Sequence, residues 1–568
     1  MVDDKEVHPS APRSTVQARF PDGRTFEAAP GTSVEAFVRA AYPDPPVLPI
    51  AALVDGELRE LAYPLQRDAQ VAPIFLSDSD GVRIYRRALS FLLITAVSEL
   101  FPETQVFIDH SLPFGGYFCQ VRGRENFSAE ELVTIQARMQ AIVAEDAPIV
   151  KERVPIEEAL ATFRQRGEDD KVRLLSHRRK DYLVLYRLHE FRDYFHGYMV
   201  PSTGYLRTFA LYPSPPGFVL QYPRRHRPTE LLPYSESPQL TAVFREYGNW
   251  LNVLGVADVG SLNEAIERGH IREIVLVSEA LHEGRIAQIA RQIAARREQV
   301  RLVLIAGPSA SGKTTFSKRL SIQLLAHGLR PFPLELDSYF VDRERTPRDE
   351  NGDYDFESLQ ALDLPLFNEQ LLALMAGQEV RLPRFDFQSG RRQEGGTVRL
   401  KPDHIILVEG IHGLNPGLLP AVPAERTFRV YVSALTQLNI DRHNRVPTTD
   451  TRLIRRIVRD AASRGYTAEE TLQRWESVRR GEKRHIFPYQ EHADAMFNSA
   501  LVYELSVLKP LAEPLLLQVA PPSPRRVEAK RLLAFLEWFV PCPQDLIPDN
   551  SLIREFIGGS ILRDYVPR

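Results

Sequence analysis

Hydrophobic residues recur along the chain with two different periods, and each period predicts a different kind of element. Near the beginning, short alternating stretches at 16–20 and 51–54 are each followed by a turn sequence that contains Asp-Gly. Alternation on both sides of such a turn predicts β-hairpins. Between them, apolar residues at helical spacing over 34–38 follow the sequence Pro-Gly-Thr-Ser. This part of the chain therefore predicts a small domain of strands with one short helix.

Longer apolar patterns with a helical period come next. They predict a helix over 85–100 and another that begins at Ser128 and runs to about 143. The second helix is preceded by Ser128-Ala-Glu-Glu, the spacing of a capping box. The connecting region at 226–300 is broken early by prolines and then predicts helices over 262–267 and 277–297, the first of them with Ser261 and Glu264 spaced as a capping box.

From residue 303 onward, short apolar runs alternate with helical patterns, which is typical of an α/β fold with a parallel sheet. The runs at 303–305 and 404–408 are rich in β-branched residues, and a helical pattern over 314–325 follows the first of them. The runs at 333–336 and 404–408 each end in an acidic residue, Asp337 and Glu409 respectively. Because the carboxyl ends of parallel strands meet at one edge of a sheet, both acids are expected to face the same ligand.

The first of these runs leads into Gly307-x-x-x-x-Gly312-Lys313-Thr314, a phosphate-binding P-loop in its required context of strand, loop and helix. Glycines let the backbone turn tightly and direct its N–H groups toward phosphate oxygens, and the helix N-terminus adds partial positive charge. Lys313 is expected to reach the β- and γ-phosphates, and the Thr314 hydroxyl to bind Mg²⁺. The predicted ATP-binding residues are Gly307, Pro308, Ser309, Ala310, Ser311, Gly312, Lys313, Thr314 and Thr315.

Two acids and one arginine-rich segment complete the candidate chemistry. Glu409 is placed to order Mg²⁺ together with Thr314, directly or through water. Asp337 is the candidate base, although an aspartate after a strand can also serve only as a turn or cap residue. Arg452, Arg455, Arg456 and Arg459 share one face of a predicted helix at 452–460, which suits phosphate binding. A solvent-exposed helix that pairs with Asp450 and Asp460 is the alternative.

The segment 301–500 resembles the uridine kinase and phosphoribulokinase family. The matching motifs, in family order, are Gly-Pro-Ser-Ala-Ser-Gly-Lys-Thr-Thr, Leu-Asp-Ser-Tyr-Phe, Asp-Tyr-Asp-Phe-Glu, Pro-Arg-Phe-Asp-Phe, Val-Glu-Gly-Ile-His and Asp-Thr-Arg-Leu-Ile-Arg-Arg-Ile-Val-Arg-Asp. The resemblance implies that Asp337 accepts the proton of the acceptor hydroxyl. It also implies that Asp355 binds ribose hydroxyls, that Phe385 and Asp386 line the acceptor pocket, and that the four arginines belong to a lid.

This sequence departs from the family pattern around the nucleoside base. Uridine kinases usually carry a tyrosine and, a few residues later, a histidine at places where this chain has Phe385 and Gly390. Losing the polar contacts that a site was built around weakens discrimination. The resemblance therefore implies phosphoryl transfer to a ribose-type primary hydroxyl more firmly than it implies selection of a pyrimidine base.

The front of the chain resembles the start of threonyl-tRNA synthetases. Phe-Pro-Asp-Gly-Arg, Pro-Gly-Thr-Ser and Leu-Val-Asp-Gly-Glu-Leu resemble the ubiquitin-like β-grasp TGS domain, and the helices that follow resemble the α+β second additional domain, which carries that family's editing site. The His-x-x-x-His and Cys-x-x-x-His pairs of that site fall here on Arg87, Phe91, Phe195 and Met199. None of these four can replace the family's ligands or bases. The resemblance thus implies a module that has lost catalysis.

Composition narrows the remaining functional classes. The net charge of −3 leaves no general field that recruits nucleic acid, although clusters such as Arg86-Arg87, Arg178–Lys180 and Arg224-Arg225 could contact RNA phosphates or simply be solvated. Two cysteines, Cys119 and Cys542, cannot build a disulfide framework. With no signal-peptide pattern and no apolar stretch long enough for a bilayer, a cytoplasmic location and no membrane partner are expected.

The length of 568 residues predicts several domains. We expect a flexible tail at 1–14, a TGS-like domain at 15–78, a degenerate editing-like domain at 79–225, a helical connector at 226–300, a P-loop kinase domain at 301–510 and a C-terminal helical extension at 511–568. The expected activity is ATP- and Mg²⁺-dependent phosphorylation of a primary hydroxyl, favouring the 5′-hydroxyl of uridine or cytidine. A kinase for another polyol or sugar phosphate, and an RNA-binding regulator whose P-loop only senses nucleotide, stay open, as does a homo-oligomeric contact.

Overall fold

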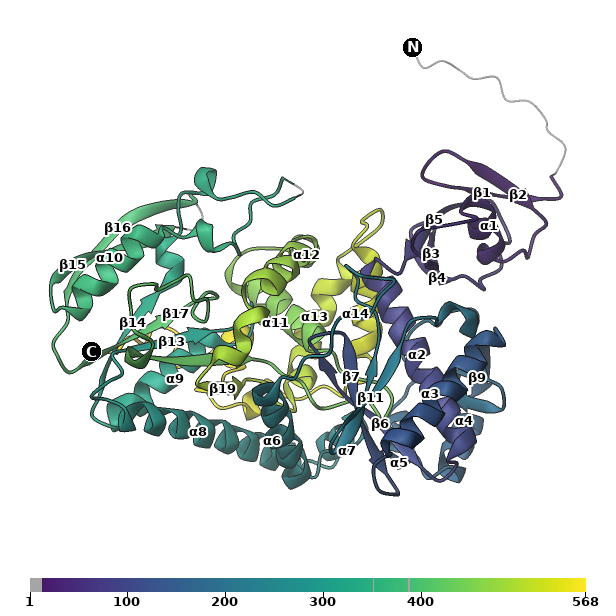
Figure 1. The fold of residues 1–568 in the computed structure, drawn as a ribbon, viewed down its shortest axis with the longest axis horizontal. Helices are drawn as coiled ribbons and strands as arrows, with labels where there is room; N and C mark the ends of the chain where they lie inside the picture. The colour runs from purple at the N-terminus through teal and green to yellow at the C-terminus, as the bar shows by residue number, and fades with distance from the viewer. Residues whose placement is uncertain (1–12, 351, 387–388, 568) are drawn as a thin grey trace, which may run out of the picture. The chain divides into compact units, whose positions relative to one another are not determined.

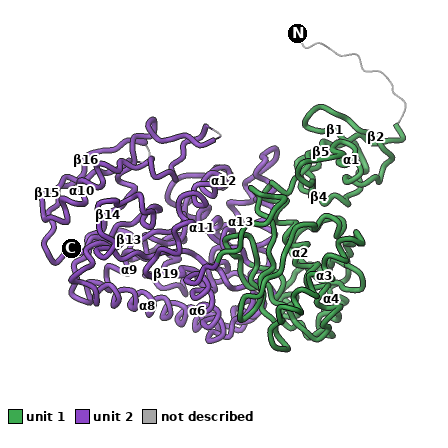
Figure 2. Tube along the Cα trace, viewed as in Figure 1, with its two compact units in different colours: residues 1–235, 442–445 green, residues 236–441, 446–568 purple. Residues whose placement is uncertain are grey.

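The computed structural model describes residues 13–350, 352–386 and 389–567. The chain divides into two compact units (Figure 2): unit 1 comprises Met1–Ser235 together with Arg442–Arg445, and unit 2 comprises Glu236–Asp441 and Val446–Arg568. Of the tail expected at 1–14, only Arg13 and Ser14 lie within the described residues.

Unit 1 begins with a five-stranded mixed sheet in the order β2-β1-β5-β3-β4 (Figure 1). Strand β1 is antiparallel to β2 and parallel to β5, and β3 is antiparallel to both β4 and β5. One helix, α1 (Val34–Ala41), accompanies it, and the Ser33 hydroxyl caps that helix at the Ala36 amide. This is the β-grasp arrangement that the sequence predicted. Its strands are β1 (Val16–Arg19), β2 (Thr25–Ala28), β3 (Pro49–Val54), β4 (Glu57–Glu60) and β5 (Ala69–Phe75).

The rest of unit 1 is an α+β domain with two antiparallel sheets, ordered β11-β12-β7-β6 and β10-β9-β8. The capping box predicted at Ser128 is confirmed, since Ser128 Oγ accepts from the Glu131 amide and the Glu131 carboxylate accepts from the Ser128 amide. The elements are α2 (Ser79–Leu100), β6 (Gln105–Leu112), β7 (Gly116–Arg122), α3 (Ala129–Ala144), β8 (Val150–Pro155), α4 (Ile156–Gln165), α5 (Asp169–Ser176), β9 (Tyr182–Leu188), β10 (Phe191–Asp193), β11 (Ala210–Ser214) and β12 (Gly217–Gln221).

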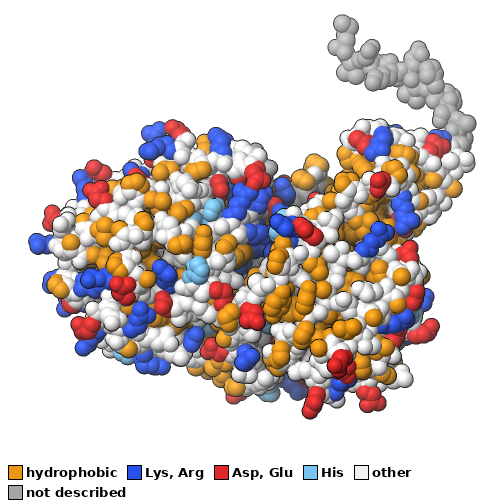
Figure 3. Space-filling model, viewed as in Figure 1, with side chains coloured by type: hydrophobic (Ala, Val, Ile, Leu, Met, Phe, Trp, Pro, Cys, Tyr) orange, Lys and Arg blue, Asp and Glu red, His pale blue; other side chains and the backbone are white. Residues whose placement is uncertain are grey.

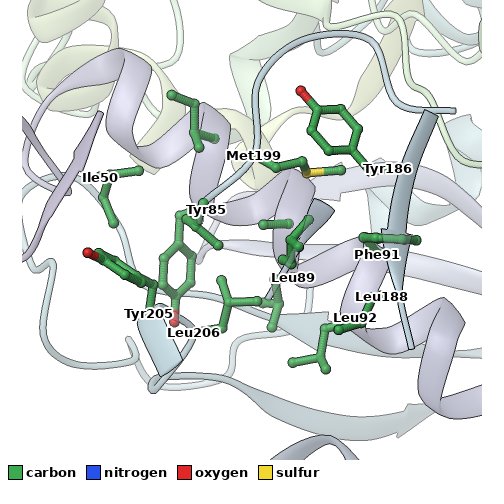
Figure 4. Close-up of a cluster of buried hydrophobic side chains, with 14 of the residues drawn as sticks. Ile50, Tyr85, Leu89, Phe91, Leu92, Tyr186, Leu188, Met199, Tyr205 and Leu206 are labelled. Atoms are coloured by element: carbon green, nitrogen blue, oxygen red, sulfur yellow. The ribbon is translucent and has the colours of Figure 1, made fainter. Parts of the chain in front are cut away.

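Helix α2 is central to the core of unit 1, as the close-up in Figure 4 shows. Its residues 88–97 are all buried, so the helix is covered on every side rather than on one stripe only. Tyr85 is buried as well, and its hydroxyl donates a hydrogen bond to the carbonyl of Thr208 (2.9 Å). The apolar residues that were predicted to form a helix over 85–100 thus form the centre of the hydrophobic core of this domain.

Unit 2 opens with three helices, α6 (Pro238–Leu254), α7 (Val259–Glu267) and α8 (Ile271–Ala295). Two details of the sequence prediction were wrong here. Pro238 does not break the chain but occupies the first turn of α6, where the missing N–H of proline is harmless. The cap of α7 is Asp258 rather than Ser261, because the Asp258 carboxylate accepts from the Ser261 amide while Ser261 Oγ accepts from the Asp258 amide.

A five-stranded parallel sheet forms the centre of unit 2, in the order β14-β17-β13-β18-β19. Every residue of β13 is buried, as expected for a strand covered on both faces. The strands that follow β13 pair on both of its sides, so β13 lies at the topological switch point, where ligands bind beyond the carboxyl ends of the strands. The strands are β13 (Leu302–Ala306), β14 (Arg330–Glu335), β17 (His404–Glu409), β18 (Thr427–Ser433) and β19 (Ala495–Asn498).

Outside this sheet, β15 (Glu379–Asp386) and β16 (Arg391–Arg399) form an antiparallel hairpin. Arg391 and Arg392 pair with Asp386 and Phe385 across it. The remaining helices of unit 2 are α9 (Lys313–Ala326), α10 (Leu364–Met375), α11 (Thr448–Ser463), α12 (Ala468–His485), α13 (Glu504–Leu517), α14 (Arg526–Leu536) and α15 (Arg554–Ile557).

Acidic and basic side chains are interspersed over the face of the molecule shown in Figure 3, in keeping with the small net charge. Cys119 and Cys542 are both buried and reduced. Across the described residues, no helix combines the length and the apolar character needed to cross a bilayer.

Candidate active site

The P-loop lies between β13 and α9, so the predicted succession of strand, loop and helix is confirmed. Gly307 is required by close packing, because a Cβ there would lie 1.9 Å from the carbonyl oxygen of Val432 on the next strand. Gly312 has a φ of 83°, and Ala310 also adopts a positive φ of 57°. Left-handed residues of this kind turn successive backbone N–H groups toward one concave point, which is a nest for an anion.

Three polar side chains meet at the start of α9 and the end of β17. Lys313 Nζ lies 4.0 Å from Glu409 Oε1 and donates to the carbonyl of Pro308 (3.3 Å). The Thr314 hydroxyl donates to Glu409 Oε2 (3.2 Å). Burial raises the pKa of Glu409 to about 7, and Asp337 and other nearby acids add to this effect against the opposing charge of Lys313. A cation bound beside Glu409 would stabilise the charged form of this carboxylate.

The donor set at this point fits Mg²⁺. A threonine hydroxyl and a carboxylate are hard oxygen ligands, and Mg²⁺ in nucleotide sites commonly takes one or two protein oxygens, leaving the rest to phosphates and water. No cluster of three or more His, Cys, Asp or Glu side chains suited to a metal exists among the described residues. Thr314 and Glu409 would therefore form a shared site, completed by a bound nucleotide, rather than a closed protein cage.

Asp337 follows β14 in a short 3₁₀ turn (Leu336–Tyr339), and its side chain keeps access to solvent. Although the side chain reaches solvent, the protein atoms around the carboxyl displace part of its water and raise its pKa, and the charges of Lys313, Arg464 and Arg459 oppose that rise. These interactions place the carboxyl within electrostatic reach of the P-loop lysine and of α11. The structure thus brings Asp337, Lys313 and Glu409 to the same edge of the sheet.

The four arginines predicted to form one face do lie on α11, but the structure divides them into two pairs. Arg452 and Arg455 are fully buried, at 1% and 0% exposure. Arg452 forms an ion pair with Glu482 of α12 and donates to the carbonyl of Ser309 (2.9 Å), and Arg455 forms one with Glu504 of α13. Buried and paired in this way, these two side chains hold the P-loop and its surrounding helices together.

Arg456 and Arg459 are less enclosed. Arg456 donates to the Ser309 hydroxyl (2.8 Å), which lies in the P-loop itself, and pairs with Asp460 (3.2 Å). Arg459 also pairs with Asp460 (2.7 Å). The neighbouring Arg464 lies near the same acid, and the sequence pattern did not single it out. Arg456 and Arg459 are therefore the members of the predicted set that keep some exposure, at 12% and 13%.

The residues expected at the acceptor side come from two segments. Asp355 Oδ1 accepts from the Glu357 amide (3.2 Å), and its Oδ2 lies 3.9 Å from His485 Nε2. Phe385 packs edge-on against Phe340, with ring centroids 5.6 Å apart. Asp386 accepts from the Ser389 hydroxyl (2.8 Å), and the turn at Gly390 has a φ of 69°. Phe387, the last residue of the Pro-Arg-Phe-Asp-Phe motif, lies outside the described residues.

Several groups at this edge of the sheet were missed by sequence reasoning. Glu482 not only pairs with Arg452 but also accepts from the Ser309 amide of the P-loop (3.1 Å). Glu357 and His412 lie within motifs that were recognised, yet neither was given a role. Their position inside those motifs is a signal that could have identified both. Glu482 carries no such local signal, because its contacts depend on tertiary packing.

The C-terminal segment contacts the P-loop helix directly. Glu555 of α15 accepts from both the amide (3.2 Å) and the hydroxyl (2.8 Å) of Thr315. Leu552 is buried against Gly312, where an added Cβ would lie 2.4 Å from the leucine side chain. The sequence predicted only a helical extension here and gave no chemistry for it.

The four positions of unit 1 at which the resemblance places an editing site hold packed side chains. Phe91, Phe195 and Met199 are buried at 0%, 3% and 1% exposure, and Figure 4 shows Phe91 and Met199 within the hydrophobic cluster. Arg87 donates to the carbonyl of Tyr198 (2.6 Å). Nearby, His189 Nδ1 lies 2.8 Å from the Glu99 carboxylate. Three of these positions thus contribute apolar side chains to the core, and Arg87 binds the backbone.

A buried charged group lies beside these positions, entirely within unit 1. His443, from the short segment that belongs to this unit, stacks on Phe195 with ring centroids 6.1 Å apart, and its Nδ1 lies 2.6 Å from Asp193. Lys171 pairs with the same aspartate. Despite burial, these neighbouring charges hold the pKa of Asp193 far below its usual value. The group is a compensated ion-pair network.

Two parts of the chain match different groups of known proteins. Residues 302–506 match the model of the Phosphoribulokinase / Uridine kinase family. The N-terminal part matches threonine–tRNA ligases, with 40% identity over 165 residues to that of Acidithiobacillus ferrooxidans and 35% over 193 residues to that of Hyphomonas neptunium. These matches cover 28% and 34% of this chain but only 25% and 29% of the two relatives. The chain therefore spans less than a third of the length of the curated relatives it matches.

Two solved structures with local similarity are described as kinases. A structure described as a possible uridine kinase from Bacillus stearothermophilus is 23% identical, with a TM-score of 0.27, and covers 38% of this chain and 97% of its own. D-glycerate 3-kinase from Cryptococcus neoformans is 17% identical, with a TM-score of 0.24, and covers 37% of this chain and 87% of its own.

Proposed function

We propose that the protein is an ATP-dependent kinase that phosphorylates a primary hydroxyl group, favouring the 5′-hydroxyl of uridine or cytidine. The observation that carries this proposal is the convergence of Lys313, Glu409 and Asp337 at the carboxyl edge of the parallel sheet, next to the P-loop. The match of residues 302–506 to a family of phosphotransferases supports the same chemistry.

In the proposed reaction, the Asp337 carboxylate accepts the proton of the acceptor hydroxyl as that oxygen attacks the γ-phosphorus of ATP. The new P–O bond forms while the bond from the γ-phosphorus to the β–γ bridging oxygen breaks, and ADP leaves with the electron pair. A positioned general base is worth about 10²- to 10⁴-fold in rate. The raised pKa of Asp337 suits this role, because it brings the carboxyl closer to the pKa needed to accept a proton.

Charge on the moving phosphoryl group would be stabilised by Lys313 from the P-loop and by Arg456 and Arg459 from α11. Thr314 and Glu409 would hold Mg²⁺, which when bound neutralises charge on the phosphates. Arg452 and Arg455 would act indirectly, by fixing the P-loop through Ser309 and the carbonyl of Ala310.

Unit 1 would contribute no hydrolysis in this proposal. Its similarity to threonine–tRNA ligases and the apolar side chains at Phe91, Phe195 and Met199 support a synthetase-derived module without editing chemistry. Contact with RNA through its basic clusters is the remaining proposal for this unit, and binding of the whole chain to labelled tRNA, with and without competing salt, is the measurement that decides it.

The activity is tested by following ATP consumption by the full chain over a panel of ribonucleosides, deoxyribonucleosides, free sugars and sugar phosphates. Because Phe385 and Gly390 offer no polar side chain to a base, we expect uridine and cytidine to be used with only a modest preference over other ribonucleosides. If the protein phosphorylates a sugar or polyol but no nucleoside, the proposed acceptor is wrong and the proposed kinase activity stands. ATP binding without turnover of any acceptor would favour the nucleotide-sensing regulator.

A further inference from the structure

Three arginines of unit 1 gather around two packed tyrosine rings. Tyr117 of β7 and Tyr222, which directly follows β12, pack edge-on with ring centroids 5.1 Å apart. The guanidinium carbons of Arg86 and Arg445 lie 5.9 Å and 5.6 Å from the centre of the Tyr117 ring. Arg224 follows Tyr222 by two residues, and Arg445 belongs to the short segment that is part of unit 1. We call Arg86, Arg224 and Arg445 the arginine cluster.

A glycine makes room for the side chain of Arg224 beside these rings. A Cβ added to Gly115 would lie 2.7 Å from Arg224 Cδ and 2.8 Å from the carbonyl oxygen of Tyr222. Gly115 has a φ of 98°, and its own carbonyl accepts a hydrogen bond from the Tyr222 amide (3.0 Å). Only glycine adopts this conformation readily and leaves the space free. The backbone therefore fixes the stem of Arg224 against Tyr222.

The charges of the arginine cluster act on one another and on Tyr222. Burial lowers the pKa of Arg224 and of Arg445, the Tyr222 hydroxyl opposes this effect, and the positive charge of Arg86 lowers both further. Burial also raises the pKa of Tyr222 to about 12, and Tyr117 adds to that rise, whereas all three arginines oppose it. Electrostatic effects of this kind weaken with distance, so the three guanidinium groups are close neighbours.

Negative charge is scarce around the arginine cluster. Arg224 is half-buried, yet it forms neither an ion pair nor a hydrogen bond with any described residue. Arg445 donates to uncharged oxygens, since its Nε donates to the carbonyl of Asp109 (2.8 Å) and its Nη1 donates to the Ser111 hydroxyl. The Asp109 carboxylate accepts from the Gln120 side chain (2.8 Å), and its charge affects the pKa of Arg445 less than burial does.

This arrangement fits a site for a phosphate group. A charged side chain that is withdrawn from water without a counter-charge is costly, and neighbouring like charges add repulsion. A bound anion removes both costs. Arginine suits phosphate because its planar group donates two parallel hydrogen bonds to phosphate oxygens. The Tyr117 hydroxyl, which has no hydrogen-bond partner among the described residues, is a further donor.

We propose that the arginine cluster, together with the Tyr117 hydroxyl, is a phosphate-binding site of unit 1. The rings of Tyr117 and Tyr222 are buried and cannot stack on a base, so the site recognises the phosphate and not the base. The inference does not depend on the kinase activity, and it narrows the RNA contact proposed for this unit to one site. Arg445 lies within the segment 302–506 that matches the kinase family, so the site needs both parts of the chain.

The first test measures binding by the full chain in the presence of saturating Mg-ADP, which occupies the P-loop. The probes are fluorescently labelled tRNA, followed by anisotropy, and inorganic phosphate, followed by calorimetry. Arg224→Gln should weaken the binding of at least one probe by about 10-fold or more, as expected for the loss of a charged hydrogen bond. For tRNA, the slope of log K against log salt should also become shallower by about 1. Arg179→Gln, at an exposed position of another basic cluster, is the control, and its affinities should change by less than about twofold.

The two probes distinguish the sources of the phosphate group. A loss with tRNA identifies a phosphate of an RNA backbone, and a loss with inorganic phosphate alone identifies a small anion, so either result supports the site. Affinity for tRNA that falls equally in Arg224→Gln and Arg179→Gln, with phosphate binding unchanged, overturns this inference and leaves a general RNA contact standing. If neither probe binds in a manner that depends on Arg224, the inference is also overturned, and absence of any tRNA binding removes the RNA contact as well.

The second test separates a binding role of Arg224 from a structural one. Because Arg224 lies beside like charges without a partner, Arg224→Gln should unfold, without ligand, at the same denaturant concentration as the natural protein or at a higher one. Arg224→Lys, which keeps the charge but not the planar group, should retain part of the affinity and carries the test if the glutamine variant does not fold. A clear loss of stability in both variants would identify a structural arginine and contradicts the inference.

Discussion

Glu555 and Thr315 form a contact that bears directly on nucleotide binding. One carboxylate oxygen of Glu555 accepts from both the amide and the hydroxyl of Thr315, at the start of the P-loop helix. Backbone N–H groups there normally cradle the α- and β-phosphates. Because Lys313 reaches the β- and γ-phosphates, the α-phosphate is expected near Thr315. A fixed negative charge therefore stands beside the place where that phosphate should bind.

Replacing this carboxylate should tighten the binding of ATP. The Glu555→Gln variant removes the charge and keeps the size of the side chain, so we expect the Kd for Mg-ATP to fall by at least about 5-fold, which corresponds to about 1 kcal/mol. Isothermal titration calorimetry with the full chain measures it. Pyrophosphate, which has no α-phosphate, should bind to the variant and to the natural protein with affinities that differ by less than about twofold.

The exposed Asp564, in the same segment, provides the control for this experiment. Asp564→Asn removes an equal charge farther along the chain and should leave the Kd for ATP unchanged. Weaker ATP binding in the Glu555 variant would mean that the carboxylate organises the nucleotide site instead of competing with the nucleotide.

Lys313 and Asp337 should separate ATP binding from chemistry. Lys313→Ala removes a positive charge from the phosphates, so both the affinity for ATP and turnover should decrease. Asp337→Asn leaves the P-loop whole, so ATP should still bind while kcat falls by at least about 100-fold. Titration of ATP and steady-state kinetics on the same preparations check both statements. Near-normal turnover in the Asp337 variant would exclude that residue as the base.

Elements with a strong local pattern could be predicted from the sequence. The buried strand Leu302–Ala306, the P-loop after it and helix α9 follow from an apolar run, a glycine motif and helical spacing, all of which act over short distances. The polar strand Arg391–Arg399 was not predicted, because it owes its conformation to pairing with β15 rather than to its own composition.

The residues of the candidate active site could be predicted only where a local sequence motif indicates the role of each residue. The four arginines of α11 share a spacing, but whether each meets a buried acid or stays available depends on Glu482 and Glu504, which come from other helices. In the same way, nothing near Glu555 in the sequence shows that it reaches Thr315. Contacts between segments that are distant in the sequence arise from packing, and a single sequence carries no record of them.

The two pairs of arginines should respond differently to mutation. Arg452→Met leaves the buried Glu482 without its main partner, and breaking a buried ion pair typically costs about 3–5 kcal/mol. Arg459→Met should cost less than about 1 kcal/mol, because Asp460 keeps Arg456 and Arg464, yet it should lower kcat by about 10-fold or more. Denaturant unfolding and turnover are measured on each variant. A stability loss in Arg459→Met equal to that in Arg452→Met would contradict this division.

Unit 1 should not hydrolyse mischarged tRNA. Phe91, Phe195 and Met199 are packed apolar side chains that can neither bind a metal nor move a proton. We expect the full chain not to hydrolyse threonine tRNA that has been mischarged with serine. We also expect elemental analysis to find no stoichiometric zinc. His189 and His196 are the histidines nearest to Phe195 and Met199 in the sequence, so His189→Ala and His196→Ala serve as controls. Hydrolysis that either variant abolishes, or one zinc per chain, would show that another set of residues has taken over the chemistry.

Glu357 should make the stability of the ligand-free protein depend on pH. Its pKa is raised from 4.5 to about 7 in the folded state, mainly by burial. A carboxyl with a raised pKa binds its proton more tightly in the folded than in the unfolded chain. Its stabilising contribution is therefore fully present below about pH 4.5 and is lost as the pH rises through about 7.

Removing this titration should flatten the pH dependence of stability. Glutamine resembles the protonated carboxyl at every pH, so Glu357→Gln should match the natural protein near pH 4.5 and exceed its free energy of unfolding by up to about 2 kcal/mol near pH 8. Denaturant unfolding without nucleotide, at several pH values, measures the difference, with Glu344→Gln at an exposed position as the control. A constant difference across this range would show that the carboxyl does not titrate there. The free energy of unfolding of Glu357→Gln can be compared with its KM for the acceptor. If the variant gains stability with rising pH and also has a higher KM, Glu357 serves function at the expense of stability, as is common for residues in active sites.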